Sequence, residues 1–180
     1  MKQLGATLLE LMVVLAVSAI LLVIGIPSFT AIANSSRLVS ATNELVSSLH
    51  LARSEAIKRN ARTVLCPSST STSCALSGDW DQGWLVFHDA NNNAARDAGE
   101  AVIQVKQALP SGLRATSSGI TAQYISYTPT GGTRQISGAL LGGTLTLCSK
   151  AGDTKEARRI IIAAATGRLR TDKFTLSACP

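Results

Sequence analysis

A single acidic residue beside a long apolar segment constrains this chain more than any other feature. Glu10 is the only charged residue between Lys2 and Arg37, and an uncharged, largely apolar run follows it over residues 11–26. A carboxylate in a hydrocarbon environment costs at least a few kcal/mol unless it finds a partner. A plain membrane anchor has no use for such a group, so the sequence indicates a helix with a function beyond membrane anchoring.

The residues around Glu10 follow a fixed order: a short basic leader with Lys2, then Gly5, four residues, Glu10 and the apolar run. The stretch from Gly5 to Leu15, GATLLELMVVL, resembles the N-terminus of type IV prepilins. This resemblance implies cleavage by a prepilin peptidase between Gly5 and Ala6 and methylation of the new N-terminus. It also implies that Glu10 sets the register of one subunit against its neighbour in a fibre. Ala6 departs from the family pattern, which usually has Phe there.

Two other interpretations of the N-terminus compete with this one. A secretory signal combines a basic start, an apolar stretch and a small-residue cleavage site, for which Lys2 and residues 31–33 would serve. Its apolar stretch is normally shorter, however, and Glu10 has no place in it. A simple anchor would use the 16 residues 11–26, which span only about 24 Å as a helix. We favour the prepilin interpretation over both.

The prepilin interpretation predicts three segments. Residues 1–5 form the leader, 6–33 the transmembrane or filament-core half of the N-terminal helix, and 34–180 an exported globular domain. It implies a single-pass protein of the inner membrane with the domain in the periplasm, which later joins a pilus at the cell surface. Its partners would be the prepilin peptidase and other major and minor pilins.

The helix is expected to continue over residues 28–60. Small and aliphatic residues recur there at spacings of three and four, which predicts one buried stripe on a soluble domain: Leu38, Ala41, Leu45, Leu49, Ala52 and Ala56. Pro27 removes one backbone hydrogen bond and predicts a kink or a loosened turn between the two halves.

Beyond Arg62 the sequence changes to short β-like runs separated by turn residues. One helix followed by a series of strands predicts an α+β fold with the helix packed on antiparallel sheet. The resemblance to prepilins implies that this fold is type IV pilin-like. The candidate strands are 63–66, 83–88, 101–107, 112–116, 124–128, 134–137, 143–148, 159–164 and 168–171.

The chain has four cysteines, all beyond the apolar segment, and an exported domain would meet an oxidising compartment. Four cysteines allow three pairings, of which we expect Cys66 with Cys74 and Cys148 with Cys179. A zinc site is the alternative, but no C-x-x-C occurs and no histidine adjoins a cysteine.

The segment WDQGWLVFHDANNN, residues 80–93, resembles a stretch found in the FimT/GspH branch of minor pilins and pseudopilins. Together with the N-terminus, this resemblance covers nearly the whole chain. We expect Trp80 and Trp84 to be core residues rather than a binding platform, because other aromatic residues are scarce.

Oxygen-bearing side chains follow this segment at the spacing of a calcium-binding EF-hand loop. They occupy positions 1, 3, 5, 9 and 12 of such a loop: Asp89, Asn91, Asn93, Asp97 and Glu100. Position 6 is Ala94, where the loop requires glycine, and strands rather than helices are expected on both sides. A polar hairpin loop whose side chains bind their own backbone is therefore the preferred interpretation, and no metal or cofactor is expected.

The C-terminal region holds most of the excess positive charge of a chain whose formal net charge is +6. Such a balance suggests a polyanionic partner. Three carboxylates, Asp153, Glu156 and Asp172, stand here against seven basic residues: Lys150, Lys155, Arg158, Arg159, Arg168, Arg170 and Lys173.

Within this region, Thr166 and Gly167 can turn the chain after an apolar strand. In extended backbone, Arg168 and Arg170 would lie on one face about 6.6 Å apart, with Leu169 directed to the core. Two guanidinium groups at that spacing suit successive phosphate oxygens. The alternative interpretation is that Arg168 and Arg170 bind no ligand and form a solvated basic strand edge that discourages edge-to-edge pairing of sheets.

The Gly-Arg-x-Arg order at residues 167–170 resembles the motif with which FimT-type pilins of transformable bacteria bind DNA. The resemblance implies that Arg168 and Arg170 bind double-stranded DNA and that Gly167 sets the backbone. Lys150, Lys155, Arg158, Arg159 and Lys173 are expected helpers by charge alone.

We therefore expect a FimT-like minor pilin that binds DNA without sequence preference for uptake in natural transformation. One alternative is a structural pseudopilin of a type II secretion system, or a pilus-priming subunit, without DNA binding. Another is adhesion to a different polyanion. No enzyme is expected, since His50 and His88 are the only histidines and no G-x-S-x-G or H-E-x-x-H motif occurs.

Overall fold

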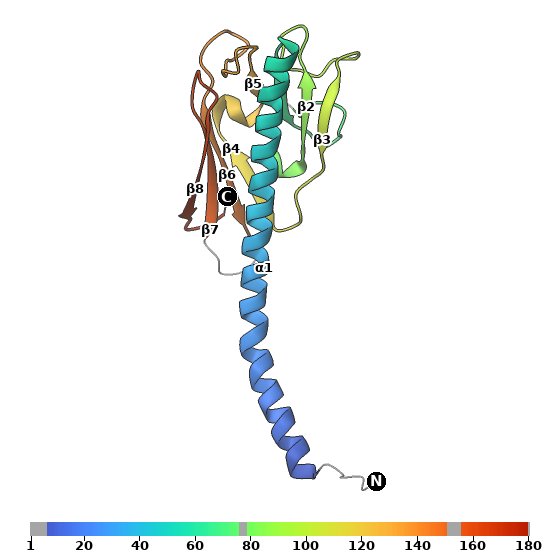
Figure 1. Cartoon of the computed structure of the whole chain (residues 1–180), viewed down its shortest axis with the longest axis vertical. Coiled ribbons are helices and arrows are strands. Elements are labelled where there is room, and N and C mark those ends of the chain that lie inside the picture. Colours follow the sequence, from blue (N-terminus) through green and yellow to red (C-terminus); the bar gives the residue numbers. More distant parts are fainter. Residues whose placement is uncertain (1–6, 76–78, 151–155, 180) are drawn as a thin grey trace.

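The computed structural model describes residues 7–75, 79–150 and 156–179. Of residues 24–28 and 31 it describes the backbone alone. Figure 1 shows one long helix whose upper half lies on a β-rich domain and whose lower half projects from it.

The helix α1 (Leu8–Arg59) begins and ends with capping interactions. The Thr7 hydroxyl accepts a hydrogen bond from the backbone N–H of Glu10 at 3.2 Å. At the other end Asn60 has a left-handed conformation, and its N–H binds the carbonyl oxygens of Ala56 and Ile57. α1 runs through Pro27 without a break, and Figure 1 shows a gradual bend of its lower half instead of a sharp kink.

The two halves of α1 have opposite environments. The predicted stripe is buried: all six of its residues, from Leu38 to Ala56, are at most 3% exposed. In the lower half the large apolar side chains described, such as Leu11, Ile20 and Phe29, are more than half exposed. Across the described residues, no helix combines the length and the apolar character needed to cross a membrane.

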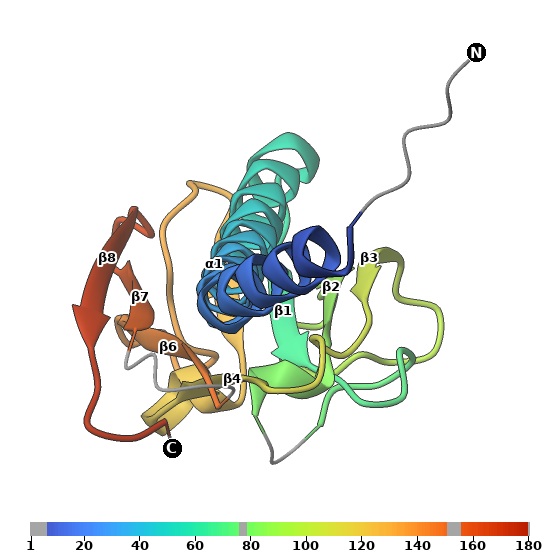
Figure 2. The ribbon, with the colours of Figure 1, turned by 90° about the horizontal axis from the view of Figure 1, so that it is seen from below.

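In the described residues, eight strands form two antiparallel sheets beside the helix, which confirms the α+β prediction. The first sheet has the order β3-β2-β1-β5, with β1 (Thr63–Pro67), β2 (Trp84–His88), β3 (Val102–Lys106) and β5 (Ile125–Tyr127). The second has the order β4-β6-β7-β8, with β4 (Leu113–Ser117), β6 (Gly143–Ser149), β7 (Glu156–Ile162) and β8 (Leu169–Thr175). Two short 3-10 helices, η1 (Trp80–Gln82) and η2 (Gly119–Ala122), lie between strands. Seen from below, α1 runs between the two sheets (Figure 2).

Eight of the nine predicted strands match observed ones, and the prediction for 134–137 is wrong. Among the described residues, that segment makes a single isolated bridge, between Arg134 and Leu140. Its chain reverses at once, because Gln135 N–H binds the Ala139 carbonyl and Gly138 N–H binds the Gln135 carbonyl. A turn this tight leaves no room for a paired strand.

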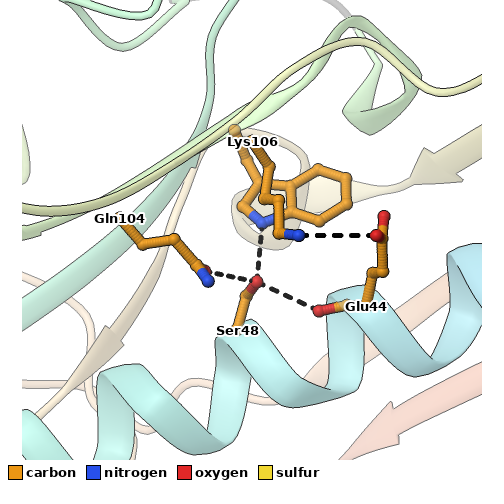
Figure 3. A network of polar contacts seen from close by, with 5 residues as sticks. Glu44, Ser48, Gln104 and Lys106 are labelled. Carbon is orange, nitrogen blue, oxygen red and sulfur yellow. Dashed lines mark hydrogen bonds and ion pairs between the residues drawn. The ribbon is translucent and has the colours of Figure 1, made fainter.

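Both tryptophans lie in the core, as predicted, and each is 0% exposed. The indole N–H of Trp84 donates to the Ser48 hydroxyl at 2.9 Å, and that hydroxyl lies 2.6 Å from Gln104 Oε1. Beside it, Lys106 on β3 pairs with Glu44 on α1 at 3.4 Å (Figure 3). This polar network fixes the register of α1 against the first sheet.

Two disulfides confirm the predicted pairing. Cys66 is bonded to Cys74, and Cys148 is bonded to Cys179. The second bond ties the C-terminal segment after β8 to the middle of the second sheet.

The β7–β8 hairpin contacts α1 at two levels. We call residues 163–170 the turn end; they comprise the segment that joins the strands and the first two residues of β8. There Arg53 Nη1 donates to the Gly167 carbonyl at 3.3 Å. We call the opposite end, where Glu156 pairs with Thr175, the base end. There the Ser35 hydroxyl donates to Glu156 Oε2 at 3.2 Å.

Candidate nucleic-acid interface

The turn end of the β7–β8 hairpin holds the predicted Gly-Arg-x-Arg motif. Ile162 and Leu169 are the last paired residues, and Leu169 packs partly buried against the core, as expected. Beyond them the turn is closed by two backbone hydrogen bonds, from Gly167 N–H to the Ala163 carbonyl and from Ala163 N–H to the Arg168 carbonyl. The motif therefore begins on a closed turn and continues into β8.

Two features of residue 167 favour glycine: its backbone conformation and the lack of space for a side chain. Its φ is +63°, a left-handed value that favours glycine. A Cβ atom here would lie 2.8 Å from Cε1 of Tyr127 and 3.0 Å from the Gly131 carbonyl oxygen. The Tyr127 ring beneath it is fully buried, and this burial raises the pKa of the phenol, which stays protonated. The turn thus packs directly against the buried Tyr127 ring.

Arg53 connects this turn to the helix, and sequence reasoning did not single it out for this role. Its guanidinium donates to the Gly167 carbonyl, 114 positions along the chain. The neighbouring Ile57 approaches Gly131, whose added Cβ would lie 2.8 Å from Ile57 Cδ1. No local pattern marks such a contact, because it depends on the packing of α1 against two separate loops.

The two arginines of the motif are both exposed but differ in their partners. Arg168 makes no ion pair among the described residues. Arg170, whose side chain is 75% exposed, pairs with Asp172 at 2.9 Å. Asp172 also lies 3.8 Å from Arg159, whose guanidinium stacks over the Phe174 ring at 4.5 Å from its centroid. Ion pairs near the surface contribute little to stability.

The other basic residues predicted as helpers do not join the motif. Arg158 and Lys173 are paired across the strands at the base end, where both bind Glu156, at 3.4 and 3.1 Å. Lys150, which follows β6, is exposed at the same level. Along the chain, Lys173 lies five residues from Arg168 and three from Arg170, or about 17 and 10 Å of extended strand. Lys155 lies outside the described residues. One basic stretch of sequence thus becomes two separate basic regions.

The loop with the spacing of an EF-hand, residues 89–100, is closed by its own hydrogen bonds. The Asp89 carboxylate accepts from Asn93 and Ala94 N–H, both at 3.0 Å, and burial raises its pKa. Glu100 accepts from Ala90 and Asp97 N–H at 2.8 and 3.0 Å. The side-chain amides of Asn91 and Asn93 donate to Asp97, whose pKa they lower. These contacts are those of a self-capped polar loop. Among the described residues, no group of three or more potential ligands is arranged to hold a metal ion.

The residues predicted for processing and assembly are only partly described. Gly5 and Ala6 lie outside the described residues. Glu10 is exposed in the first turn of α1, where a negative charge is favoured by the helix dipole. Its side chain is therefore open to a partner.

Comparison with solved structures shows that the chain has the fold of type IV pilin-like subunits. The minor pilin FimU of Pseudomonas aeruginosa superposes with a TM-score of 0.61 at 20% sequence identity, covering 81% of this chain and 97% of that one. The minor pseudopilin EpsH of the type 2 secretion system of Vibrio cholerae superposes with a TM-score of 0.52 at 14% identity. That match covers 75% of this chain and 95% of the other. No curated protein sequence matches the chain.

Family models match the sequence over both of its parts. A model of the prokaryotic N-terminal methylation motif matches residues 1–26, and the model described as type II transport protein GspH matches residues 41–166. The second match ends immediately before Gly167, so the arginine motif lies outside it. The chain belongs to the GspH family, the GspH/FimT type of minor pilins and pseudopilins.

Proposed function

We propose that this minor pilin binds extracellular double-stranded DNA through Arg168 and Arg170, without sequence preference, for uptake in natural transformation. The supporting observation is the turn end of the β7–β8 hairpin. It presents two exposed guanidinium groups on a turn that Gly167 closes and Arg53 attaches to α1. Such a rigid support lowers the entropy lost when the side chains bind.

The charges around the turn favour phosphate over a neutral ligand. Arg168 has no competing carboxylate among the described residues, and Arg170 shares Asp172 with Arg159. Arg53 brings a third guanidinium to the same turn. A guanidinium group can bind a phosphate through two parallel N–H donors. Such contacts with the DNA backbone do not distinguish one base sequence from another.

Binding through so few contacts is expected to be weak and sensitive to salt, because each phosphate contact releases counterions. A filament that presents several subunits to one duplex would compensate by raising the effective concentration of sites. The proposed activity is binding alone, with no reaction and no cofactor.

Processing and location follow from the N-terminal motif. We propose that a prepilin peptidase cleaves between Gly5 and Ala6 and that the new N-terminus is methylated. The subunit is then held in the inner membrane by residues 6–33, with its domain in the periplasm, until it joins other pilins. The match to the N-terminal methylation motif supports this sequence of events. The exposed apolar side chains of the lower half of α1 also fit it, since they need a lipid or protein environment.

A purely structural role is the second candidate, and one observation favours it. The match to the GspH family covers residues 41–166 and does not include the arginine motif, and EpsH belongs to a secretion system. A pseudopilin or pilus-priming subunit would need Glu10 and α1 but neither Arg168 nor Arg170. Adhesion to another polyanion would need the arginines but would show no preference for DNA.

Fluorescence anisotropy with a labelled duplex tests the proposal. The buried core begins at Leu38, so a fragment of residues 34–180 retains it together with both disulfides. We expect binding that weakens with salt and falls about tenfold in each of Arg168→Ala and Arg170→Ala. The double change of Lys150 and Lys173 to Gln, at the base end, is the control and should bind normally. An unmodified fragment that fails to bind at low salt would favour the structural role.

A further inference from the structure

The contacts of Arg170 identify the side of the β7–β8 hairpin on which the arginine motif continues. Arg170 lies 2.9 Å from the Asp172 carboxylate, and the same carboxylate lies 3.8 Å from Arg159 on β7. The Arg159 guanidinium in turn lies over the Phe174 ring. Because alternate side chains of a strand point to the same face, these four residues share one face of the second sheet.

The opposite face of the hairpin is the one that contacts α1. Glu156 accepts the hydrogen bond from Ser35 on that side and pairs there with Arg158 and Lys173. Arg158 and Arg159, although neighbours in sequence, therefore have side chains on opposite sides of the sheet. Figure 2 shows α1 beside one face of the second sheet, and we call the face directed away from α1 the outer face.

The strand register extends the outer face from β8 onto β6. In one row across the strands, Arg170 is followed by Ile161 and then by Thr144. In the next row, Arg159 is paired with Thr146. Both threonines are partly exposed, and their hydroxyls make no hydrogen bond among the described residues. Two strand spacings, about 10 Å, therefore separate the guanidinium groups of β8 from free hydroxyls on β6.

The outer face is covered below these two rows. The next row pairs Ala157 with Cys148, which is bonded to Cys179. Ala157 lies on the outer face but is 0% exposed. Lys150 follows Cys148 by two residues and lies beyond this covered row. The open part of the outer face is thus the part next to the turn end.

We propose that Arg159, Thr144 and Thr146 on the outer face continue the phosphate-binding site that begins at Arg168 and Arg170. The inference rests on the proposed DNA binding and states where the duplex lies: across β8, β7 and β6, on the side away from α1. Arginine and threonine side chains are both common donors to the phosphates of DNA. The α1 side of the same hairpin then makes no contact with the duplex.

The surroundings of Arg159 suit it to a phosphate. Its side chain is 43% exposed, and its guanidinium lies 4.5 Å from the centroid of the Phe174 ring. Stacking on a ring leaves the N–H donors at the edge of the guanidinium plane available for phosphate oxygens. The contact with Asp172, at 3.8 Å, is too long for a hydrogen bond. A stacked side chain also loses less conformational freedom when it binds.

A matched pair of variants tests the role of Arg159. Arg159→Gln and Arg158→Gln remove the same charge from neighbouring residues on opposite faces. The affinity of the 34–180 fragment for a labelled duplex is measured by anisotropy over a series of salt concentrations. We expect Arg159→Gln to weaken binding about fivefold and to reduce the slope of log affinity against log salt by about one. Arg158→Gln should leave both quantities unchanged.

An indirect role of Arg159 through Asp172 is tested separately, because this carboxylate also pairs with Arg170. The change Arg159→Gln is repeated in an Asp172→Asn background. Direct contact with a phosphate predicts that the loss of affinity persists in that background. A loss that disappears when Asp172 is neutral would overturn the proposal, since Arg159 would then act only on the availability of Arg170.

The hydroxyl contacts are tested with a second matched pair, Thr146→Val and Thr171→Val. Thr171 is exposed on β8 opposite Ile160, on the face that is directed to α1. We expect Thr146→Val to weaken DNA binding about threefold with an unchanged salt slope, because no charge is removed. Thr171→Val should bind normally. Equal losses in the two variants would contradict a duplex on the outer face.

Failure of this inference can be distinguished from failure of the proposed function. A fragment whose DNA binding requires Arg168 and Arg170 but not Arg159 would refute the outer-face site and leave the DNA function standing. A fragment that binds no duplex even at low salt would refute both.

Discussion

The two ends of the β7–β8 hairpin are built by different forces although they belong to the same pair of strands. At the turn end, packing and backbone conformation hold the chain, through the left-handed Gly167 and the buried Tyr127 ring. At the base end, charges hold it, through Glu156 and its three partners. The comparison teaches that a local charge count does not define a binding surface. At the turn end Arg168 makes no ion pair among the described residues and Arg170 is exposed although it pairs with Asp172, whereas both cations of the base end share the less exposed Glu156.

The largest expected effect is that of Gly167→Val. A β-branched residue at φ +63° is strained, and its Cβ would contact Tyr127 and the Gly131 carbonyl. We expect the free energy of unfolding to fall by about 3 kcal/mol and DNA affinity to fall although both arginines remain. Chemical denaturation and anisotropy measure the two effects.

Gly138→Val is the matched control for this prediction. Gly138 also has a positive φ, +86°, but an added Cβ there would meet no atom within 4 Å. It should therefore show the backbone strain alone and keep normal DNA binding. Equal losses of stability in the two variants would mean that packing under Gly167 does not fix the turn.

The base end is expected to respond to acid. Burial acts to raise the pKa of Glu156, but Lys173, Ser35 and Arg158 outweigh it and hold that pKa below the usual 4.5. A lowered pKa in the folded state means that the carboxylate stabilises the protein above about pH 4.5 and that this contribution is lost as the pH falls further. We expect Glu156→Gln to lower the free energy of unfolding by about 1 kcal/mol at neutral pH, measured by urea denaturation. A variant with the wild-type dependence on acid would show that Glu156 does not support the base end.

Asp172→Asn should sharpen the assignment of the turn end. Asp172 pairs with both Arg170 and Arg159, so its neutralisation frees two guanidinium groups. We expect DNA affinity to rise about threefold, with a steeper dependence on salt. Glu156→Gln removes the same charge at the base end and should leave DNA affinity unchanged. A larger gain of DNA affinity from Glu156→Gln than from Asp172→Asn would indicate that DNA binds at the base end and would contradict our proposal.

The smallest expected effect is a gain of stability from Ala165→Gly. Ala165 lies in the turn with φ +67°, where an alanine is disfavoured and a glycine is not. We expect about 0.5 kcal/mol of added stability and unchanged DNA binding, from denaturation curves of the two proteins. A loss of stability would show that the turn tolerates alanine without strain.

Local patterns predicted the parts of the fold that depend on neighbours in sequence. The spacing of Leu38, Leu45 and Leu49 predicted the buried stripe, and the cysteine positions led to both disulfides. The turn at Thr166 and Gly167 was also expected. The prediction of a strand at residues 134–137 was wrong because the β-like composition of this segment does not reveal that the chain reverses at Gly138.

The partners of the charged side chains could not be predicted, because they depend on strand register and on contacts across the fold. Arg158 and Lys173 meet at Glu156 only because β7 and β8 pair in one register. Arg53 reaches Gly167 from a helix more than a hundred residues earlier. The division of one basic stretch into two regions therefore appeared only in the structure.

The most direct test of the account is whether DNA binding depends on the turn end and not on the base end. The dissociation constant for a labelled duplex is measured with the 34–180 fragment and with two double variants that remove the same charge. These are Arg168→Gln, Arg170→Gln at the turn end and Lys150→Gln, Lys173→Gln at the base end. We predict a loss of about tenfold or more in the first variant and an unchanged affinity in the second. Equal losses in the two variants would show that both ends form one binding surface and would contradict the separation of the two ends.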